Sequence, residues 1–286
     1  MTPTFLHSAP QRVVIVNPTG RYASAQVAAM RAAGTSIVAG IAPGRGGTIQ
    51  DGLPLLDDLS QLDAPADAAV LYTPPDGVLD AVRDGVAARI PLIVAAAEYV
   101  PVHDSLKAAT IAREAGCWLV GPNTLGLAVP GQMLLGSIAP EFITPGRVTL
   151  LCRSGTLTLA IARLLTEAGI GQRAVIHMGG DLVIGRNPHE YLAALAEDSA
   201  TDAVLYCGEL GGDKEYALAA ALPALGKPLV ALVMGRHAPA GTRMGHAGAL
   251  AGAERETAAA KLAALAAAGA ITVERPEQAI EALKRL

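Results

Sequence analysis

The residues of this chain best suited to covalent chemistry lie in the segment Gly241–Ala249. It places His246 among very small residues, with Arg243 three positions earlier. Small neighbours leave an imidazole open to attack, and a guanidinium holds phosphoryl oxygens through charge-assisted hydrogen bonds. The alternative is a glycine-rich loop whose histidine has a structural role. This segment alone favours the structural role, and three other segments of the chain shift the interpretation to a histidine that carries a phosphoryl group.

A second segment, Arg153–Thr158, directly follows an apolar run. Ser154 or Gly155 can begin a helix here, with Thr156 in its first turn. The free N–H groups and the dipole at a helix start favour a phosphate. The alternative is an ordinary serine N-cap, which stabilises a helix by about 1 kcal/mol.

A third segment, Gly208–Gly212, places Glu209 at the end of another apolar run. A carboxylate there can accept a hydrogen bond from one nitrogen of His246, fixing its tautomer and leaving the other nitrogen as nucleophile. The alternative is a solvated glutamate in a turn. Gly179–Asp181 is a similar turn whose role the sequence leaves open.

The first half of the chain contains two weaker candidates for anion binding. Asn17–Tyr22 follows an apolar run and can direct backbone N–H groups at a phosphate. Its glycines do not match the dinucleotide fingerprint, and no convincing acidic residue ends the next apolar run. That run ends in Pro43–Thr48, where Arg45 among glycines suits an anion as well as it suits a surface turn.

The order of apolar and helical segments predicts α/β sheets. Continuous apolar runs of this length are typical of strands buried on both faces of a parallel sheet. The expected strands are Arg12–Pro18, Ser36–Pro43, Ala68–Thr73, Pro91–Glu98, Cys117–Val120, Arg147–Cys152, Ala174–Met178, Ala203–Gly208, Leu229–Met234 and Ile271–Glu274. Expected helices include Asp76–Ala88, Val102–Ala115, Leu157–Ala168 and Glu254–Ala268, with Gly116, Gly169 and Gly269 as C-caps.

Residues 122–146 are rich in Gly and Pro and show no clear period, so we interpret them as the connection between two α/β domains. Every candidate segment above follows an expected strand. Ligands of open α/β sheets bind beyond the carboxyl ends of the strands, which supports these segments as sites.

Composition excludes several classes of protein. Of the 286 residues, 51% are hydrophobic and 17% charged, which indicates a buried core rather than disorder. No apolar run is long enough to predict a transmembrane span, and residues 1–11 do not resemble a secretory signal. The net charge of −4 and the lack of a Lys/Arg cluster argue against a nucleic-acid surface. Three cysteines without CxxC spacing predict neither disulfides nor a metal site, and we expect a cytoplasmic protein.

Together these segments resemble the alpha-subunit family of succinyl-CoA synthetase (ADP- or GDP-forming), with the chain as a divergent member. Malate–CoA ligases and the CoA-binding part of ATP-citrate lyase are its relatives. The resemblance covers nearly the whole chain, and the matching motifs occur in the family's order. They are Thr19-Gly20, Pro43–Gly47, Glu98, Gly121-Pro122-Asn123, Ser154-Gly155-Thr156, Gly179–Asp181, Gly208–Gly212 and Met244–Ala249.

The resemblance implies a Rossmann-like CoA-binding domain over residues 1–125 and a flavodoxin-like ligase domain over residues 126–286. His246 matches the histidine that is phosphorylated, and Glu209 matches its acidic support. Ser154, Gly155 and Thr156 match the phosphate-binding helix start, where Arg243 would add charge. The implied coenzyme A residues are Thr19, Gly20, Arg21, Tyr22, Arg45, Ala96, Ala97, Glu98 and Asn123.

The resemblance implies an acid–thiol ligase, which joins a carboxylic acid to coenzyme A as in the tricarboxylic acid cycle. The histidine takes the γ-phosphoryl group of ATP or GTP and passes it to a carboxylate, and the CoA thiol attacks the acyl phosphate. A separate ATP-grasp beta subunit would bind the nucleotide and Mg²⁺, in an αβ or α₂β₂ assembly. We expect no metal site within this chain itself.

Four departures from the family pattern bear on ligand binding. The first loop reads Thr-Gly-Arg-Tyr-Ala from Thr19 instead of Thr-Gly-Ser-Gln-Gly, and Arg45 replaces a common lysine. Ala96-Ala97 replaces the more usual Ile-Thr. Leu159 stands where the succinate enzymes have a tyrosine near the acyl substrate. We therefore expect an acid other than succinate, or not succinate alone.

Two other classes of function compete with the ligase. A non-catalytic CoA-binding or sensing protein would fit the altered first loop, but it has no need of a phosphorylatable histidine. An NAD-dependent oxidoreductase is disfavoured, because this chain lacks the fingerprint glycines of a dinucleotide site. The sequence leaves open the carboxylic acid, which could be malate, the nucleotide, the assembly and the physiological direction.

Overall fold

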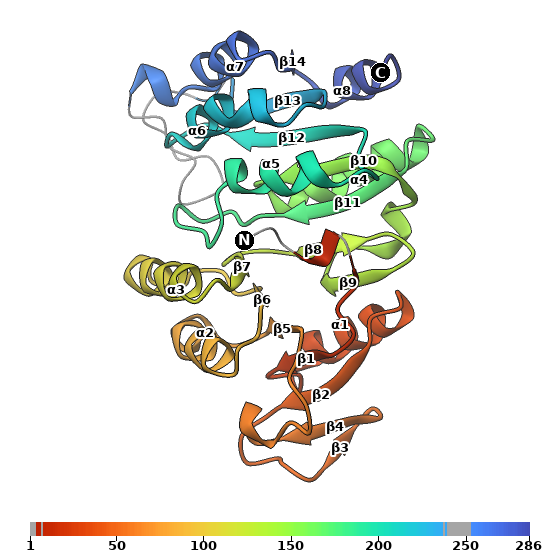
Figure 1. The fold of residues 1–286 in the computed structure, drawn as a ribbon, viewed down its shortest axis with the longest axis vertical. Helices are drawn as coiled ribbons and strands as arrows, with labels where there is room; N and C mark the ends of the chain where they lie inside the picture. The colour runs from red at the N-terminus through yellow and green to blue at the C-terminus, as the bar shows by residue number, and fades with distance from the viewer. Residues whose placement is uncertain (1–3, 7, 237, 239–252) are drawn as a thin grey trace. The chain divides into compact units, whose positions relative to one another are not determined.

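The structure is a computed structural model that describes residues 4–6, 8–236, 238 and 253–286. The chain divides into two compact units (Figure 1). The first runs to Pro140 and also includes Val183–Arg186, and the second comprises Glu141–Leu182 and Asn187–Leu286. The expected division into functional domains 1–125 and 126–286 stays a prediction.

The first unit is built on a mostly parallel sheet. Its strands are β1 (Val13–Val16), β2 (Ile37–Ile41), β3 (Ile49–Gln50), β4 (Leu53–Leu56), β5 (Ala68–Leu71), β6 (Leu92–Ala95) and β7 (Trp118–Val120). Their order is β3-β4-β2-β1-β5-β6-β7, with β3 antiparallel at the edge. Without β3, the order is 3-2-1-4-5-6, the Rossmann arrangement. The expected Rossmann-like fold is confirmed.

Helices cover both faces of this sheet. The helices are α1 (Arg21–Ala32), α2 (Val78–Ala87) and α3 (Val102–Glu114), and α2 packs against α3. In Figure 1, α2 and α3 lie on one side of the strands and α1 on the other. Val14, Ile93 and Val82 belong to one buried apolar cluster that α2 and α3 close. This core fixes the strand ends from which the first candidate loops emerge.

An antiparallel hairpin, β8 (Gly126–Val129) with β9 (Met133–Gly136), lies in the stretch that we interpreted as the connection between two domains. The boundary between the two compact units, at Pro140 and Glu141, falls within that stretch, but the sequence did not predict the hairpin. Each strand has only four residues and all are buried, so no alternation reveals them. Glycine is required at the first residue of β8 and at the last residue of β9. A Cβ on Gly126 would meet the Leu135 carbonyl oxygen at 1.8 Å. At Gly136 it would meet the Leu125 carbonyl oxygen at 2.2 Å.

The second unit contains five parallel strands. They are β10 (Pro145–Cys152), β11 (Gln172–His177), β12 (Ala203–Glu209), β13 (Leu229–Met234) and β14 (Ile271–Val273), in the order β14-β13-β12-β10-β11. In chain order this is 2-1-3-4-5, the flavodoxin-like arrangement. The order reverses between β10 and β12, so the topology predicts a ligand site beyond the ends of these two strands.

Helices of this unit fall into two layers. The helices are α4 (Gly155–Glu167), α5 (Pro188–Glu197), α6 (Lys214–Ala221), α7 (Ala258–Ala267) and α8 (Pro276–Leu283). One layer packs α4 against α8, and the other packs α5 against α6 and α6 against α7. Short 3-10 turns are η1 (Thr4–Leu6), η2 (Leu59–Gln61), η3 (Pro75–Gly77), η4 (Pro140–Phe142), η5 (Leu222–Ala224) and η6 (Glu254–Glu256). All ten strands expected from the sequence are present within a few residues.

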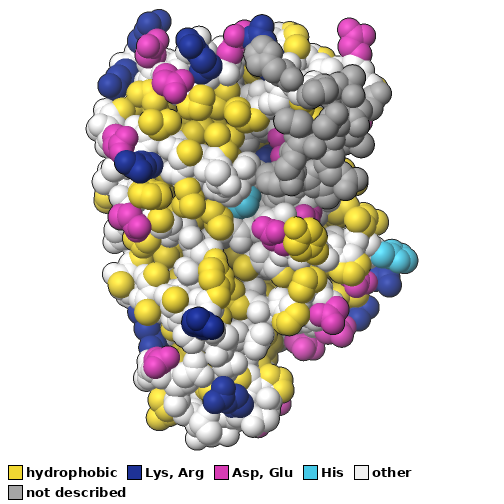
Figure 2. All heavy atoms as spheres, turned by 180° about the vertical axis from the view of Figure 1, so that it is seen from behind, with side chains coloured by type: hydrophobic (Ala, Val, Ile, Leu, Met, Phe, Trp, Pro, Cys, Tyr) yellow, Lys and Arg dark blue, Asp and Glu magenta, His cyan; other side chains and the backbone are white. Residues whose placement is uncertain are grey.

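Over the part of the chain that the structure describes, no helix is long and apolar enough to span a membrane. On the face drawn in Figure 2, Lys and Arg side chains are scattered and alternate with Asp and Glu side chains. Cys117, Cys152 and Cys207 are buried free thiols.

Thr35 links helix α1's loop to the hairpin of the first unit and gives a test of the fold. Its buried hydroxyl donates to the Leu134 carbonyl at 2.6 Å and accepts from the Leu134 N–H at 2.9 Å. Thr35→Val keeps the shape but leaves both backbone groups unpaired. We expect a loss of about 1–3 kcal/mol in unfolding free energy. Urea unfolding followed by Trp118 fluorescence measures it, since the chain's one tryptophan lies in this unit.

The matched control is Thr110→Val on α3. Its exposed hydroxyl donates only to the Leu106 carbonyl of its own helix, so its midpoint should stay within about 0.5 kcal/mol of wild type. Equal midpoints for the two variants would contradict the role given to Thr35.

Candidate functional site

The second unit's sheet brings three expected segments to one edge. Arg153-Ser154 follow β10, Gly179–Asp181 follow β11, and Glu209 ends β12. These strands are parallel, and Cys152 pairs in register with both His177 and Cys207. The segments therefore leave the sheet side by side at the reversal of strand order, where open α/β sheets bind ligands.

Helix α4 begins as the sequence predicted, with Ser154 as its N-cap. The Ser154 hydroxyl accepts from the Leu157 N–H at 3.4 Å, and the Thr158 hydroxyl donates to the Ser154 carbonyl at 2.7 Å. The first backbone N–H groups of a helix, here from Gly155 onward, have no partner within the helix. They favour an anion beside the Ser154 turn. The phosphate-binding role of Ser154, Gly155 and Thr156 stays a prediction.

Glu209 is buried rather than solvated, with an exposed fraction of 7%. Its Oε1 lies 2.9 Å from Nη2 of Arg153, and both side chains are almost fully enclosed. Arg153 also donates from Nε to the Gly179 carbonyl and from Nη2 to the Asp181 carbonyl, each at 2.9 Å. One guanidinium thus connects the loops after three neighbouring strands.

Sequence reasoning missed Arg153, although it named the segment that Arg153 begins. The available signal is a charged residue directly after a strand buried on both faces, where a charge needs a partner. His177, the last residue of β11, is buried, and its Nε2 lies 3.1 Å from the Arg153 carbonyl oxygen, so it supports the same turn.

A second buried cation, Lys261 of α7, holds the backbone of the Glu209 turn. Its Nζ donates to the Glu209 carbonyl at 2.8 Å and to the Gly211 carbonyl. Its partner is Glu215 of α6, at 2.6 Å, and both side chains are about 1% exposed. Tyr206 donates to the other Glu215 oxygen at 2.7 Å. Burial, together with the Glu215 charge, raises the pKa of Tyr206 well above its usual value, so the phenol stays a donor.

Lys214, the first residue of α6, adds a third cation. Its Nζ donates to the Leu182 carbonyl at 2.6 Å, in the loop that contains Asp181. Burial, and then the positive charge of Arg153, lower the pKa of Lys214 to about 8. Lys214 is therefore mostly protonated at pH 7, and an anion bound nearby would hold its proton more firmly.

His246 and Arg243 lie outside the described residues. The residues on either side of that segment are described, and both sides bind the turn that follows Glu209. The Leu210 N–H donates to the Met234 carbonyl at 3.0 Å, and the Gly211 N–H donates to the Glu256 carbonyl at 2.8 Å. Met234 and Glu256 thus both contact the turn after Glu209.

Leu159, the expected substrate residue, lies on α4 and is half-buried. Its side chain is one turn from the helix start at Ser154. Its contact with an acyl substrate stays a prediction.

In the first unit, the loop after β1 leads into helix α1 through the N-cap Gly20, which has no side chain to cap the first N–H groups. Thr19 is half-buried, while Arg21 and Tyr22 are exposed. The Tyr22 ring packs edge-to-face on Tyr72, with centroids 5.9 Å apart. The first N–H groups of α1 therefore have no side-chain cap, and the exposed cation Arg21 lies beside them.

The glycine loop after β2 is already closed on an internal carboxylate. Asp57 Oδ1 accepts from the Gly44 N–H at 2.7 Å and from the Gly46 N–H at 2.9 Å. Arg45 between them is exposed. Two backbone donors that a phosphate could use thus bind Asp57, and Arg45 is the group of this loop that can reach an anion.

The loop after β6 and the loop after β7 meet. The Asn123 N–H donates to the Ala97 carbonyl at 2.7 Å. Gly121 allows this approach, because a Cβ there would meet the Ala95 carbonyl oxygen at 2.4 Å. Ala96 and Ala97 are half-buried and Glu98 is exposed. The structure therefore places Ala97 and Asn123 together at the carboxyl edge of the sheet.

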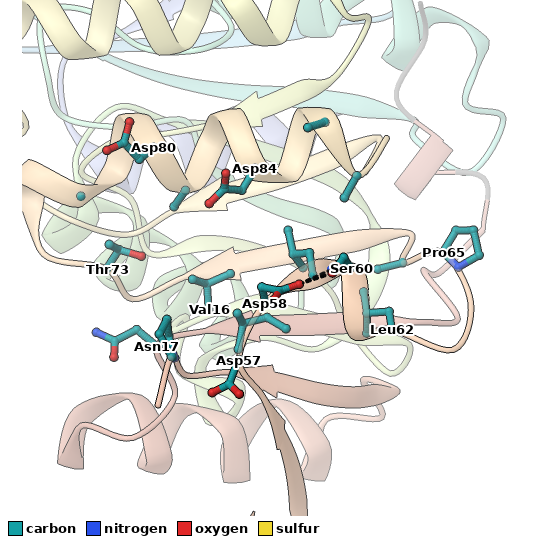
Figure 3. A pocket seen from close by; sticks show the side chains of 18 of the residues that line it. Val16, Asn17, Asp57, Asp58, Ser60, Leu62, Pro65, Thr73, Asp80 and Asp84 are labelled. Carbon is teal, nitrogen blue, oxygen red and sulfur yellow. Dashed lines mark hydrogen bonds between the residues drawn. The ribbon is translucent and has the colours of Figure 1, made fainter. Parts of the chain in front are cut away.

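A cleft of about 910 Å³ opens at the reversal of strand order between β1 and β5 (Figure 3). Its wall includes the strand-end residues Asn17 and Thr73 and five aspartates: Asp57, Asp58, Asp63, Asp80 and Asp84. None of the expected CoA residues lines it, although Pro43 and Asn17 adjoin them. An acidic wall disfavours phosphates and suits an uncharged or hydroxyl-bearing group.

Within the described ranges, no group of three or more His, Cys, Asp or Glu side chains is placed to hold a metal ion.

Two family models match the chain. One, described as "CoA binding domain", matches residues 10–99, and the other, described as "CoA-ligase", matches residues 151–271. The chain is 40% identical over 272 residues to succinate–CoA ligase [ADP-forming] subunit alpha 2 of Archaeoglobus fulgidus, covering 94% of this chain and 95% of that one. It is 37% identical over 290 residues to the ADP-forming sulfoacetate-CoA ligase subunit SauD of Bilophila wadsworthia, covering 99% and 98%.

Among solved structures, the chain is similar to ATP citrate lyase from Methanothrix soehngenii in complex with citrate and coenzyme A. The TM-score is 0.86 at 27% identity, over 96% of this chain. The chain spans 49% of the length of that protein.

The Lys261–Glu215 pair gives a test of the site's framework. Lys261→Met leaves the Glu215 carboxylate buried without its cation, and we expect a loss of about 3–5 kcal/mol in unfolding free energy. Adding Glu215→Gln removes that stranded charge, so the double variant should be more stable than Lys261→Met alone. Chemical denaturation of the three proteins measures both effects.

The control is Lys284→Met, since Lys284 is exposed at the end of α8. Its unfolding free energy should stay within about 0.5 kcal/mol of wild type. A Lys261→Met protein as stable as this control would show that the buried pair does not hold the turn.

Proposed function

This chain belongs to the family of alpha subunits of ADP-forming succinate–CoA ligases and related CoA ligases, and on that premise we propose that it acts through a phosphohistidine at His246. The family membership agrees with the resemblance drawn from the motifs. The chain is a CoA ligase subunit, and its relatives' designation as alpha subunits implies a partner subunit.

One observation best supports the phosphohistidine. Glu209 is buried at the reversal of strand order, paired with Arg153 and close to the turn that begins α4. Both sides of the segment that contains His246 bind the turn after Glu209. A carboxylate held there, with helix N–H groups nearby, supports an imidazole on one nitrogen while the other takes the phosphoryl group.

The proposed reaction has three steps. A His246 nitrogen attacks the γ-phosphorus of ATP or GTP and releases the nucleoside diphosphate. An oxygen of the carboxylic acid then attacks the phosphohistidine, forming an acyl phosphate and freeing the imidazole. The CoA thiol attacks the acyl carbon and gives the thioester, with phosphate and the thiol proton released. Ser154, Gly155, Thr156 and Arg243 hold the phosphoryl oxygens, and Glu209 fixes the imidazole tautomer.

The nucleotide and Mg²⁺ are assigned to an ATP-grasp beta subunit, in an αβ or α₂β₂ assembly in the cytoplasm. The first unit's residues fit coenzyme A in part. The open start of α1, with Arg21 and Arg45, suits the phosphates, while the acidic cleft suits the uncharged part of the nucleoside. Thr19, Gly20, Tyr22, Ala96, Ala97, Glu98 and Asn123 complete the proposed CoA site.

The acid is proposed to differ from succinate, so a place in the tricarboxylic acid cycle depends on the substrate. Leu159 has no hydroxyl to bind a second carboxylate, and one relative is named for sulfoacetate. A pocket without that hydroxyl leaves room for a different substituent on the acid.

The phosphorylation of His246 is tested with the ATP-grasp subunit encoded nearest to this chain. The two are co-expressed and given γ-labelled ATP or GTP with Mg²⁺. We expect an acid-labile, base-stable label on wild type, its loss in His246→Asn, and its discharge by an acid plus CoA. His103→Asn, at an exposed histidine of α3, should label as wild type does. Absence of label with any nucleotide would favour the alternative, a CoA-binding regulatory protein.

The substrate proposal is tested by steady-state rates with succinate, malate, itaconate, sulfoacetate and longer acids. We expect the specificity constant for succinate to be lower than that for another acid, and Leu159→Tyr to shift the ratio toward succinate by about tenfold, the effect of roughly one hydrogen bond. A wild-type preference for succinate would sink the proposal.

A further inference from the structure

Arg153 is a buried cation beside the proposed reaction site, and the proposed reaction assigns it no role. Its exposed fraction is 3%. Its three polar contacts, to the Gly179 carbonyl, the Asp181 carbonyl and the Glu209 carboxylate, are each 2.9 Å long. They come from loops after two other strands, so the guanidinium has one allowed orientation.

Glu209 is held at both ends by buried cations. Arg153 contacts its carboxylate, and Lys261 donates to its backbone carbonyl at 2.8 Å. Glu209 is only 7% exposed, so water contributes little to stabilising its charge. Its position is therefore fixed by described residues of the same unit.

In the proposed reaction, the phosphoryl group on His246 creates an electrostatic problem for Glu209, the carboxylate proposed to support that imidazole. It brings about two negative charges, and like charges within about 4–6 Å disfavour each other. A carboxylate that took up a proton would become a donor and could no longer accept from an imidazole N–H. A fixed cation paired with the carboxylate offsets this repulsion.

We propose that Arg153 is a positioning residue for the reaction at His246: it holds the Glu209 carboxylate aimed and charge-compensated while the phosphoryl group arrives. This rests on the proposed function. Arginine is required because its planar fork contacts two carbonyls and the carboxylate at once. Lysine would keep the charge but lose this geometry.

Other charged or titratable groups also face Glu209, so the pH range of a test matters. They come from four elements and are Cys152 on β10, Tyr206 on β12, Lys214 and Glu215 on α6, and Lys261 on α7. Lys214 loses its proton near pH 8, because burial lowers its pKa to about 8. A series kept between about pH 5.5 and 7 avoids that change.

The test uses the complex with the beta subunit and follows the rate of histidine phosphorylation. We expect Arg153→Met to slow it by roughly 10²-fold, the lower range for a positioned acid–base group. Its acidic limb should move to higher pH, because an uncompensated buried carboxylate takes up a proton more readily. Arg153→Lys should restore the limb and only part of the rate. In a Glu209→Gln background, Arg153→Met should add little further loss.

Retained assembly with the beta subunit and a cooperative unfolding transition show that each variant is folded, and if Arg153→Met does not fold, the Arg153→Lys profile decides. A folded variant with the wild-type rate and limb would overturn the proposal, and so would a loss of equal size in the Glu209→Gln background. A wild-type complex that takes no label on His246 would instead overturn the proposed function and this inference with it.

Discussion

A carboxylate buried at the end of a strand is the constraint around which the second unit is arranged. Glu209 lies where β12 leaves the sheet, and it is almost fully enclosed. A buried charge without a partner would destabilise the fold by several kcal/mol. The chain meets this requirement with Arg153 on the carboxylate and Lys261 on the backbone carbonyl. The second cation then needs Glu215, and Glu215 needs Tyr206. One buried charge thus determines residues on β12, α6 and α7 and in the loop after β10.

The sequence was sufficient for the parts of this arrangement that depend on local chemistry. Apolar runs bounded by turns predicted ten of the fourteen strands in the described residues, and small or capping residues predicted the start of α4 at Ser154. Gly116, Gly169 and Gly269, expected as C-caps, all have positive φ. Parallel order followed from the alternation of strands and helices. From that order, the meeting of Ser154 and Glu209 at one edge could be expected before any coordinates.

What the sequence did not predict depends on contacts between distant segments. Lys261 lies in an alanine-rich helix, where one lysine looks like a solvated side chain, and it is about 50 residues from the turn it holds. The hairpin of β8 and β9 has no alternation because both of its faces are buried. Asp57 binds the Gly44 and Gly46 N–H groups across a loop. The sequence therefore suggested a phosphate site where the structure has a carboxylate.

The two units differ in the charged groups that surround their candidate ligand sites. Around the start of α4, among the described residues, Arg153, Lys214 and Lys261 face two carboxylates, Glu209 and Glu215, and the helix N-terminus adds partial positive charge. Groups fixed in advance stabilise a developing anion without reorganising during the reaction. The cleft of the first unit is lined instead by aspartates. The two arginines of the proposed CoA site, Arg21 and Arg45, lie outside this lining and are exposed. Phosphoryl transfer is therefore favoured in the second unit, whereas the first is suited to hold the uncharged part of a ligand whose phosphates stay near the surface.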